Sequence, residues 1–363
     1  AAGGYLLSYR SLGIPHTPAV MLAGLHGFQF PAYDRSDGLS LPFGAAISLD
    51  SNRLQITPAL TYRSQLGRLD PAVNGTLQAS RRVRFDGFAG RSTFSNDAWI
   101  RSDLVNSAAT LFLGTDTRNY YRADRGEIIG HYLFETSRTD FEPLLGVRSE
   151  RAWSVRPDSD ATGGPWSLFG HHAHDGILRP NPRIDDGTIT SALVGGRLNW
   201  QGQGGVVLGA NDVTEIAGAS PVHHGFVQST VHATIGFPTF GSQRFDLETH
   251  AVFTAGDSTP RQRWAYLGGS ATLPFLGLLS EGGDQLLFID SRYSIPIDAI
   301  TLPFVGAPTL ALRDVIGGAG VGRLPALEHN VGVRVSLSFL KFDAMLDPSR
   351  RRVRFSTGLS MSR

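Results

Sequence analysis

The side chains best suited to bind a metal ion lie in one short segment. Residues 170–175 read GHHAHD, and Asp185 and Asp186 follow downstream. Imidazole and carboxylate groups could together hold zinc or copper. The histidines do not have the spacing of an HExxH helix or of another recurrent ligand pattern, and a solvated histidine-rich loop has the same composition. We therefore predict no metal site and no cofactor, and the sequence leaves open whether loop 170–186 binds metal.

Nucleophilic catalysis lacks its usual sequence markers. The chain contains no G-x-S-x-G segment and no cysteine. The lack of cysteine excludes thiol catalysis, disulfides and cysteine-based zinc sites, and no serine can be assigned as a nucleophile from its neighbours. We therefore predict that the protein is not an enzyme. The formal net charge of +1 gives no reason to expect a nucleic-acid partner.

Charged residues alternate with apolar residues in several segments. At 330–338, NVGVRVSLS places Val331, Val333 and Val335 on one side of an extended strand and Arg334 on the other. The same alternation recurs in the neighbouring C-terminal segments. The charged residues predicted to share the polar face are Asp246, Glu248, Asp290, Arg292, Asp314, Arg334, Arg352 and Arg354. Because unpaired charges are costly at low dielectric, we expect Asp290, Arg292 and Asp314 to form ion pairs.

This alternation with a period of two residues continues along the whole chain and predicts the fold. Most segments are ~9–12 residues long, which suits a tilted strand crossing a bilayer better than the ~5–6 of a soluble strand. At about 22 residues per strand and connection, the chain would form roughly 16 strands, with 14 as the fallback. We predict one domain, residues 1–363, folded as an all-β, closed antiparallel transmembrane β-barrel with apolar residues toward lipid and charges toward the lumen.

The connections between the segments differ in length. Long external loops are expected at 157–186, 202–221 and 256–283, and the family resemblance described below implies that one loop folds into the lumen. No stretch reaches the ~18 apolar residues of a transmembrane helix. We expect no helix of useful length, and 104–114 reads as a weak strand.

One segment resembles a known family. Residues 262–297 read QRWAYLGGSATLPFLGLLSEGGDQLLFIDSRYSIPI, which resembles the surface-antigen barrel of the BamA/TamA outer-membrane assembly superfamily. In that family a Gly-Gly-x-x-x-Leu/Val-Arg-Gly-Tyr/Phe loop folds into the lumen, and a strand reading Glu-x-Arg-Tyr/Phe-x-Ile/Leu-Pro-Ile/Leu follows. Gly268, Gly269 and Leu273 match the approach to the loop. Asp290 and Arg292 match the strand, and Asp314 takes the place of an aspartate on a later strand.

Two features differ from the family pattern. Pro274-Phe275 stands where the loop arginine and glycine are expected, and in relatives that arginine reaches acidic groups on the barrel wall. The family's periplasmic POTRA modules are not present in this chain, and the sequence leaves open whether they precede it in a precursor.

The resemblance implies an outer-membrane barrel of a Gram-negative-type bacterium that inserts or translocates other proteins, or anchors a larger surface complex. It implies contact with outer-membrane lipid and lipopolysaccharide, and with envelope proteins or client polypeptides. The last strand, which contains Val353, Phe355 and Leu359, would close the barrel against the first at a weak seam. A passive porin-like channel is the alternative, and a hydrolase at the barrel rim is the least favoured reading.

Overall fold

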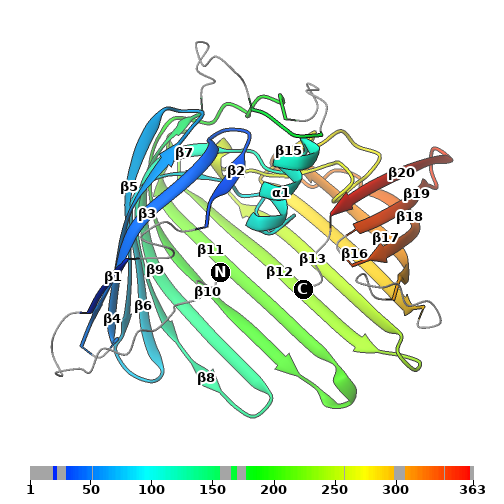
Figure 1. The fold of residues 1–363 in the computed structure, drawn as a ribbon, viewed down its shortest axis with the longest axis horizontal. Coiled ribbons are helices and arrows are strands. Elements are labelled where there is room, and N and C mark those ends of the chain that lie inside the picture. The colour runs from blue at the N-terminus through cyan, green and yellow to red at the C-terminus, as the bar shows by residue number, and fades with distance from the viewer. Residues whose placement is uncertain are drawn as a thin grey trace.

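The computed structural model describes residues 19–22, 30–50, 52–155, 165–169, 177–256, 258–297, 307–338 and 340–359. Within these ranges strands are the main element, with one helix and two short 3-10 helices (Figure 1). Eighteen strands belong to one sheet with antiparallel pairing, and two short strands form a second sheet. The prediction of an all-β, antiparallel fold is therefore confirmed.

The long strands follow one another as a meander. They are β3 (Gly38–Leu49), β4 (Leu54–Arg63), β5 (Arg68–Gln78), β6 (Val83–Phe94), β7 (Tyr121–Tyr132), β9 (Thr139–Ser154), β10 (Gly187–Gln201), β11 (Val207–Ala219), β12 (Phe226–Pro238), β13 (Arg244–Ala255), β16 (Gln285–Pro296), β17 (Thr309–Gly320), β18 (Glu328–Leu337), β19 (Leu340–Asp347) and β20 (Arg352–Leu359). Each pairs with its neighbours in this order, so β13 pairs directly with β16.

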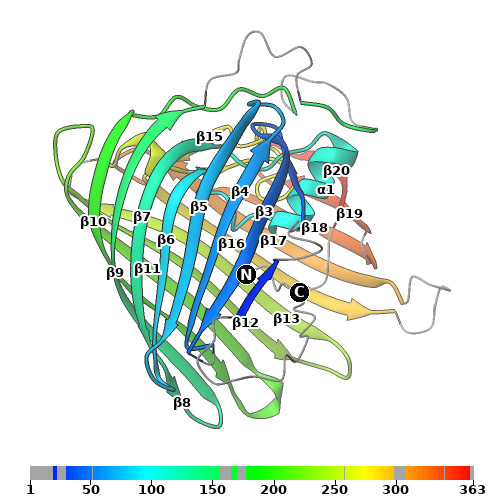
Figure 2. The same ribbon diagram turned by 60° about the vertical axis from the view of Figure 1, so that its left-hand side comes forward.

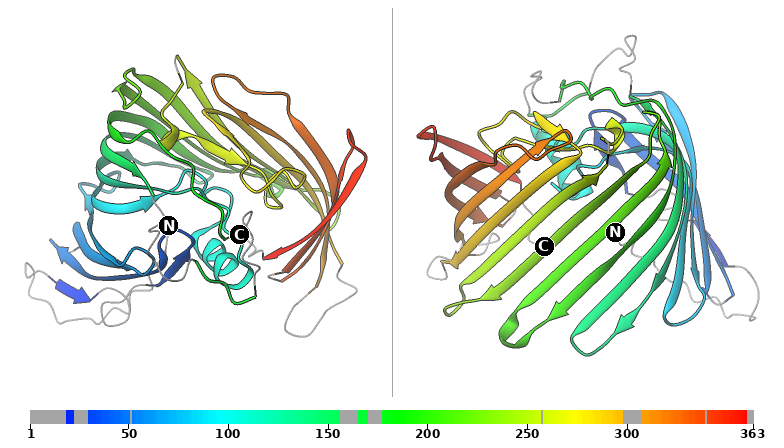
Figure 3. Two further views of the ribbon diagram at one scale, coloured as in Figure 1. Left: turned by 90° about the horizontal axis from the view of Figure 1, so that it is seen from above. Right: turned by 180° about the vertical axis from the view of Figure 1, so that it is seen from behind.

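Short strands complete the sheet and define its first edge. Strands β1 (Ala19–Leu22) and β2 (Ala32–Asp34) both pair with β3, and β8 (Phe134–Glu135) lies beside β9 where β7 ends. The eighteen strands therefore occupy sixteen positions across the sheet. The tilted strands, seen from the side in Figure 2, curl around a central space when seen from above in Figure 3, and we call this space the lumen. No hydrogen-bonded pair joins β20 to β1 or β2 within the described ranges, and we call this gap the seam.

The strands turn apolar side chains away from the lumen. In β18, Val333 and Val335 are 39% and 36% exposed, whereas Arg334 between them is 7% exposed. On the convex side of β9, Leu145 and Val147 are 65% and 59% exposed. Large apolar side chains on the surface and charges in the interior reverse the arrangement of a water-soluble protein. The alternation found in the sequence therefore places its apolar face outside.

The main apolar cluster inside the curl lies where the β13–β16 connection packs on the wall. Leu267 and Leu273 of this connection contact a buried group of strand residues. Those residues are Val252, Leu286, Phe288, Val315, Ala319 and Met345. The connection is therefore held inside the lumen partly by apolar packing.

Two expectations about local structure are wrong. Segment 104–114 is not a strand, because α1 (Asp103–Leu113) covers it with Ser102 at its N-cap and Gly114 at its C-cap at φ 66°, a left-handed conformation that glycine adopts without strain. Residues 202–221 are not a long loop, because β11 spans most of them and only a short turn with η1 (Gln203–Gly205) precedes it. No helix in the described part of the chain is both long and apolar enough to cross a membrane.

Candidate functional site

The connection between β13 and β16, which we call the lumen loop, doubles back inside the curl (Figure 3). It contains η2 (Arg261–Arg263), β14 (Ala265–Leu267) and β15 (Glu281–Gly283). A tight turn follows β14, where Gly268 N donates to Thr272 Oγ1 at 2.9 Å and Gly269 N donates to Leu273 O at 3.1 Å. Gly268 has a φ of 124°, and a Cβ there would lie 2.0 Å from Gly277 O. The glycines at this turn therefore allow a backbone path that other residues cannot follow.

Arg263 fastens the lumen loop to the wall. Its Nε and Nη2 donate to the two carboxylate oxygens of Glu215 on β11 at 2.7 and 3.0 Å, and its Nη1 donates to Glu150 on β9 at 2.7 Å. Burial alone would lower the pKa of the Arg263 guanidinium, but Glu215 and Glu150 hold that pKa well above its ordinary value. Such a two-pronged, charge-assisted contact fixes both position and orientation. An arginine of the lumen loop thus contacts acidic side chains on the wall, and it is Arg263 and not a residue at Pro274-Phe275.

Two other arginines share the glutamates. Arg125 Nε donates to Glu150 at 2.7 Å, and Arg148 Nη1 lies 3.6 Å from Glu215 Oε2. Arg148 also pairs with Glu127. The wall carboxylates therefore face three arginines, of which only Arg263 belongs to the lumen loop.

A second connection, between β6 and β7, is hydrogen-bonded to the lumen loop through Asn96 and Asp97, and we call this contact the clasp. Asn96 Nδ2 donates to the carbonyl oxygens of Gln262 and Trp264 at 2.7 and 3.0 Å. The carboxylate of Asp97 accepts hydrogen bonds from Tyr266 N at 3.1 Å and from Asn119 N at 2.8 Å. Burial raises the pKa of Asp97 to about 7 despite these donors. Asp97 is therefore a titratable group at the contact between two inward segments.

The clasp is expected to weaken as the pH rises toward 7. Because the folded-state pKa of Asp97 lies above its unfolded value, the stability gained by binding the proton is present at acidic pH and is lost as the pH rises through about 7. The unfolding midpoint in detergent should therefore be lower at pH 8 than at pH 5.5, and the difference should shrink in Asp97→Asn. An equal pH slope in both chains would contradict this assignment.

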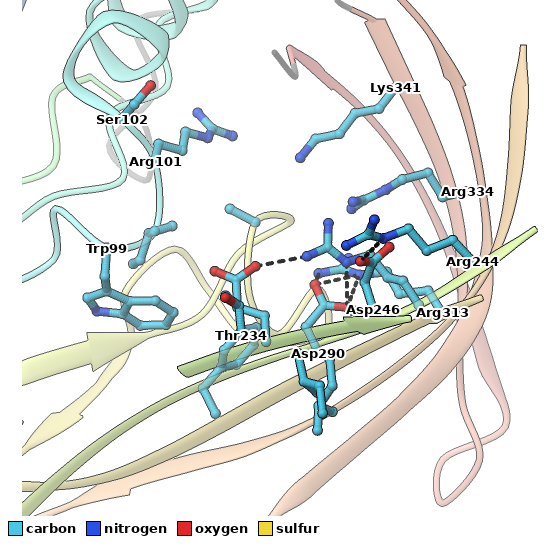
Figure 4. A pocket seen from close by; sticks show the side chains of 18 of the residues that line it. Trp99, Arg101, Ser102, Thr234, Arg244, Asp246, Asp290, Arg313, Arg334 and Lys341 are labelled. Atoms are coloured by element: carbon cyan, nitrogen blue, oxygen red, sulfur yellow. Dashed lines mark hydrogen bonds and ion pairs between the residues drawn. The ribbon is translucent and has the colours of Figure 1, made fainter. Parts of the chain in front are cut away.

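A cavity of about 840 Å³ lies between the two inward segments and strands β12, β13 and β16–β19 (Figure 4). It brings together five of the predicted lumen charges, which are Asp246, Glu248, Asp290, Arg292 and Arg334. Each of these five charges forms an ion pair at the wall. Arg244 contacts Asp246 at 2.6 Å, Arg292 contacts Glu248 at 2.8 Å, and Arg313, which the sequence did not single out, contacts Asp290 at 2.8 Å. Arg334 pairs with Asp343 at 2.6 Å.

Three other predicted charges lie outside this cavity. Asp314 lies on the convex side, where it is 2.7 Å from His329 Nε2, because the alternation turns its neighbour Arg313 toward the lumen. Arg354 on β20 donates a hydrogen bond to Pro274 O at the tip of the lumen loop. Arg352 begins β20 and is exposed opposite Asp347.

Of the residues expected at the seam strand, Val353 and Phe355 of β20 are 60% and 78% exposed, and the side chain of Leu359 lies outside the described residues. The GHHAHD segment also lies outside them. Asp185 accepts a hydrogen bond from Arg261 N, and Asp186 accepts one from Ser154 N, both at 2.8 Å. In the ranges that the structure covers, no three histidine, aspartate or glutamate side chains gather as a metal site.

Helix α1 lies at the seam. It contacts β2 on one side and β20 on the other, and Figure 3 shows it in the opening of the curl. Tyr33 N of β2 donates to Ser107 Oγ at 3.1 Å, so the helix is tied to the first edge. Leu104, Phe112 and Leu113 are exposed on its surface. An apolar helix thus occupies the place where a closed barrel would have hydrogen bonds between its first and last strands.

Comparison with known proteins rests on structure. No family model and no curated protein matches the chain. A crystal structure of BamA from Haemophilus ducreyi lacking POTRA domains 1–3 matches with a TM-score of 0.52 and 11% identity, over 95% of this chain and 70% of that chain. The chain shares the fold of that barrel, although strand pairing between β20 and the first edge is not seen in the described ranges. CdiB from Escherichia coli matches with a TM-score of 0.50 and 11% identity, over 95% of this chain and 62% of that one.

The resemblance inferred from residues 262–297 is therefore confirmed for the fold. The resemblance of residues 262–297 located the lumen loop, but the sequence did not reveal α1, Arg263 or the wall carboxylates. A capping signal for α1 was present, because Ser102 precedes the helix, Asp103 begins it and Gly114 follows it. No local signal marks Arg263, because its partners Glu215 and Glu150 lie 48 and 113 residues away.

Proposed function

We propose that the chain is an outer-membrane β-barrel that takes up other polypeptides at its seam, for insertion or translocation. The observation that carries this proposal is the pair of sheet edges, β1 and β2 on one side and β20 on the other, with no hydrogen bonds between them in the described ranges. An unpaired edge presents free N–H and C=O groups that can pair with an added strand. A client strand entering there would satisfy groups that are costly to expose in hydrocarbon.

The membrane setting is part of the same proposal. The convex apolar surface suits outer-membrane lipid and lipopolysaccharide in a Gram-negative-type bacterium. In that setting the barrel would close across the seam, either through β20 and the first edge or through an incoming strand. Residues 1–363 would act as one barrel domain without catalysis of their own, and envelope proteins or client polypeptides would be the partners.

A passive channel for small solutes is the competing function. The fastening of the lumen loop by Arg263 argues against it, because the loop and its apolar cluster occupy part of the lumen. We expect only small, unsteady conductance from the purified protein in a planar bilayer. A large, steady conductance would favour the channel.

The seam can be tested directly because the chain has no cysteine. Leu104→Cys on α1 and Phe355→Cys on β20, both exposed positions, would be joined by a flexible linker with a cleavable disulfide. The protein in liposomes is expected to accelerate the folding of a small, unfolded outer-membrane β-barrel. Linking the seam should reduce the folding rate of this small barrel to its rate in protein-free liposomes. Cleavage of the linker should restore the acceleration.

The matched control places the same linker away from the seam. Leu145 on β9 and Val194 on β10 are direct cross-strand partners, and both are exposed. The Leu145→Cys, Val194→Cys chain should remain active when linked. If linking at the seam leaves the acceleration unchanged, or if the unlinked protein never accelerates folding, the proposal is wrong.

A further inference from the structure

The charges around the lumen cavity do not balance. Its three carboxylates, Asp246, Glu248 and Asp290, are each matched by an arginine, and Arg334 is matched by Asp343 of β19. Two cations that line the same cavity, Arg101 and Lys341, have no ion pair among the described residues. The cavity therefore has two more basic than acidic side chains, with Asp343 counted.

Arg101 is buried without the partners that a guanidinium needs. It is 9% exposed, and its Nε and Nη1 have no hydrogen-bond partner in the described part of the chain. Burial lowers the pKa of Arg101 to about 10, although Asp116 acts in the opposite direction. The side chain therefore still carries its charge at neutral pH. A buried donor without an acceptor costs about 1–3 kcal/mol, and a charged one costs more.

Lys341, the only lysine of the chain, faces Arg101 across the cavity, with Arg334 nearby (Figure 4). It is partly buried, and no hydrogen bond or ion pair engages its ammonium group among the described residues. Its stem passes over β20, where a Cβ on Gly358 would lie 3.1 Å from Lys341 Cε. Nη1 of Arg313, in the same cavity wall, is also buried without a partner.

We propose that Arg101 and Lys341, with Arg313 and Arg334 beside them, form a binding site for a phosphate group carrying about two negative charges. A dianion matches the two cations that the wall leaves unbalanced, and its oxygens would accept the free donors of Arg101 and Arg313. The phosphate could be inorganic phosphate or a phosphate monoester on a lipid headgroup. Because Arg101 precedes α1 and Lys341 lies on β19 beside β20, the bound group would bridge the two sides of the seam. The site itself does not depend on the proposed function.

Ligand binding to the folded state should raise its stability. At constant ionic strength, we expect phosphate to raise the unfolding temperature of the detergent-solubilised protein more than chloride does. The unfolding temperature of the protein in phosphatidylcholine vesicles containing phosphatidic acid would be compared with that in vesicles lacking phosphatidic acid. A response to phosphatidic acid alone would assign the site to a lipid headgroup, and a response to inorganic phosphate would assign it to the free ion. No response to either would overturn the proposal.

Substitutions identify the residues. Arg101→Gln and Lys341→Gln should each weaken phosphate binding roughly tenfold or more, as expected for losing one charge-assisted hydrogen bond. The control is Arg350→Gln, because Arg350 is an exposed cation that pairs with Glu328 and Asp347 at the β19–β20 turn. Unchanged affinity in both cavity variants would contradict the assignment.

The wild-type chain gives an independent test if a variant fails to fold. Since Lys341 is the only lysine, an amine-reactive reagent modifies one side chain, and peptide mass spectrometry separates it from the N-terminal amine. The bound ligand should slow the modification of Lys341 and leave that of the N-terminal amine unchanged. Equal rates with and without phosphate and phosphatidic acid would overturn the proposal.

Discussion

Replacing Arg263 by alanine is expected to destabilise the protein by roughly 3–5 kcal/mol, the usual loss when one partner of a buried ion pair is removed. Glu150 and Glu215 would each keep one arginine, Arg125 and Arg148, but would lose the guanidinium that joins them. The lumen loop would then depend on its apolar cluster and on the clasp at Asp97. Denaturant unfolding, followed by the gel shift between folded and heated protein, measures the change.

The matched control for this variant is Arg91→Ala. Arg91 contacts Asp124 at 2.7 Å, but the two side chains are 44% and 45% exposed. An exposed pair contributes about 0–1 kcal/mol, so this change should have a small effect. Arg263→Ala should also raise the conductance in a planar bilayer as the loop leaves the lumen. If the two variants have the same stability and the same conductance, Arg263 does not fasten the lumen loop.

A charge on the convex surface should be nearly as damaging. Leu145 is 65% exposed on β9, on the side that we assign to lipid. Leu145→Arg is expected to cost about 2–4 kcal/mol in a bilayer if the position lies near the midplane. Unfolding from liposomes in denaturant measures this cost. In a water-soluble protein the same substitution at so exposed a position would change stability by no more than about 0.5 kcal/mol.

Leu144→Arg provides the comparison at the adjacent position. Leu144 lies on the other face of β9, which it shares with Glu142 and Glu150. An arginine there would enter the lumen, where carboxylates are present, and should be tolerated better than Leu145→Arg. The reverse order of the two effects would mean that the faces are assigned wrongly.

The features predicted well from the sequence are those set by strand period. In β18, the side chains of Val333, Arg334 and Val335 alternate between faces whatever the rest of the fold does. The glycine pair before Leu273 also acts locally, because a left-handed turn favours glycine. The strand period gave the strands and their antiparallel arrangement, whereas the segment that enters the lumen was expected from the resemblance of residues 262–297 to the BamA/TamA family.

The features that were missed depend on contacts between distant parts of the chain. Arg263 becomes important only because β9 and β11 bring Glu150 and Glu215 to the same place. Arg101 and Lys341 are 240 positions apart in the numbering and meet only across the lumen. Helix α1 was read as a strand because its eleven residues are too few for periodicity alone to separate the two structures.

The most direct test of the account asks which medium surrounds the exposed valines of β18. Nitroxide spin labels would be placed at Val333→Cys, Val335→Cys and, on the opposite face, Ser336→Cys, with the protein in phospholipid liposomes. We expect frequent collisions of the first two labels with oxygen dissolved in lipid, and collisions of the third with a water-soluble nickel chelate. Labels at Val333 and Val335 that collide with the chelate and not with lipid-dissolved oxygen would contradict it.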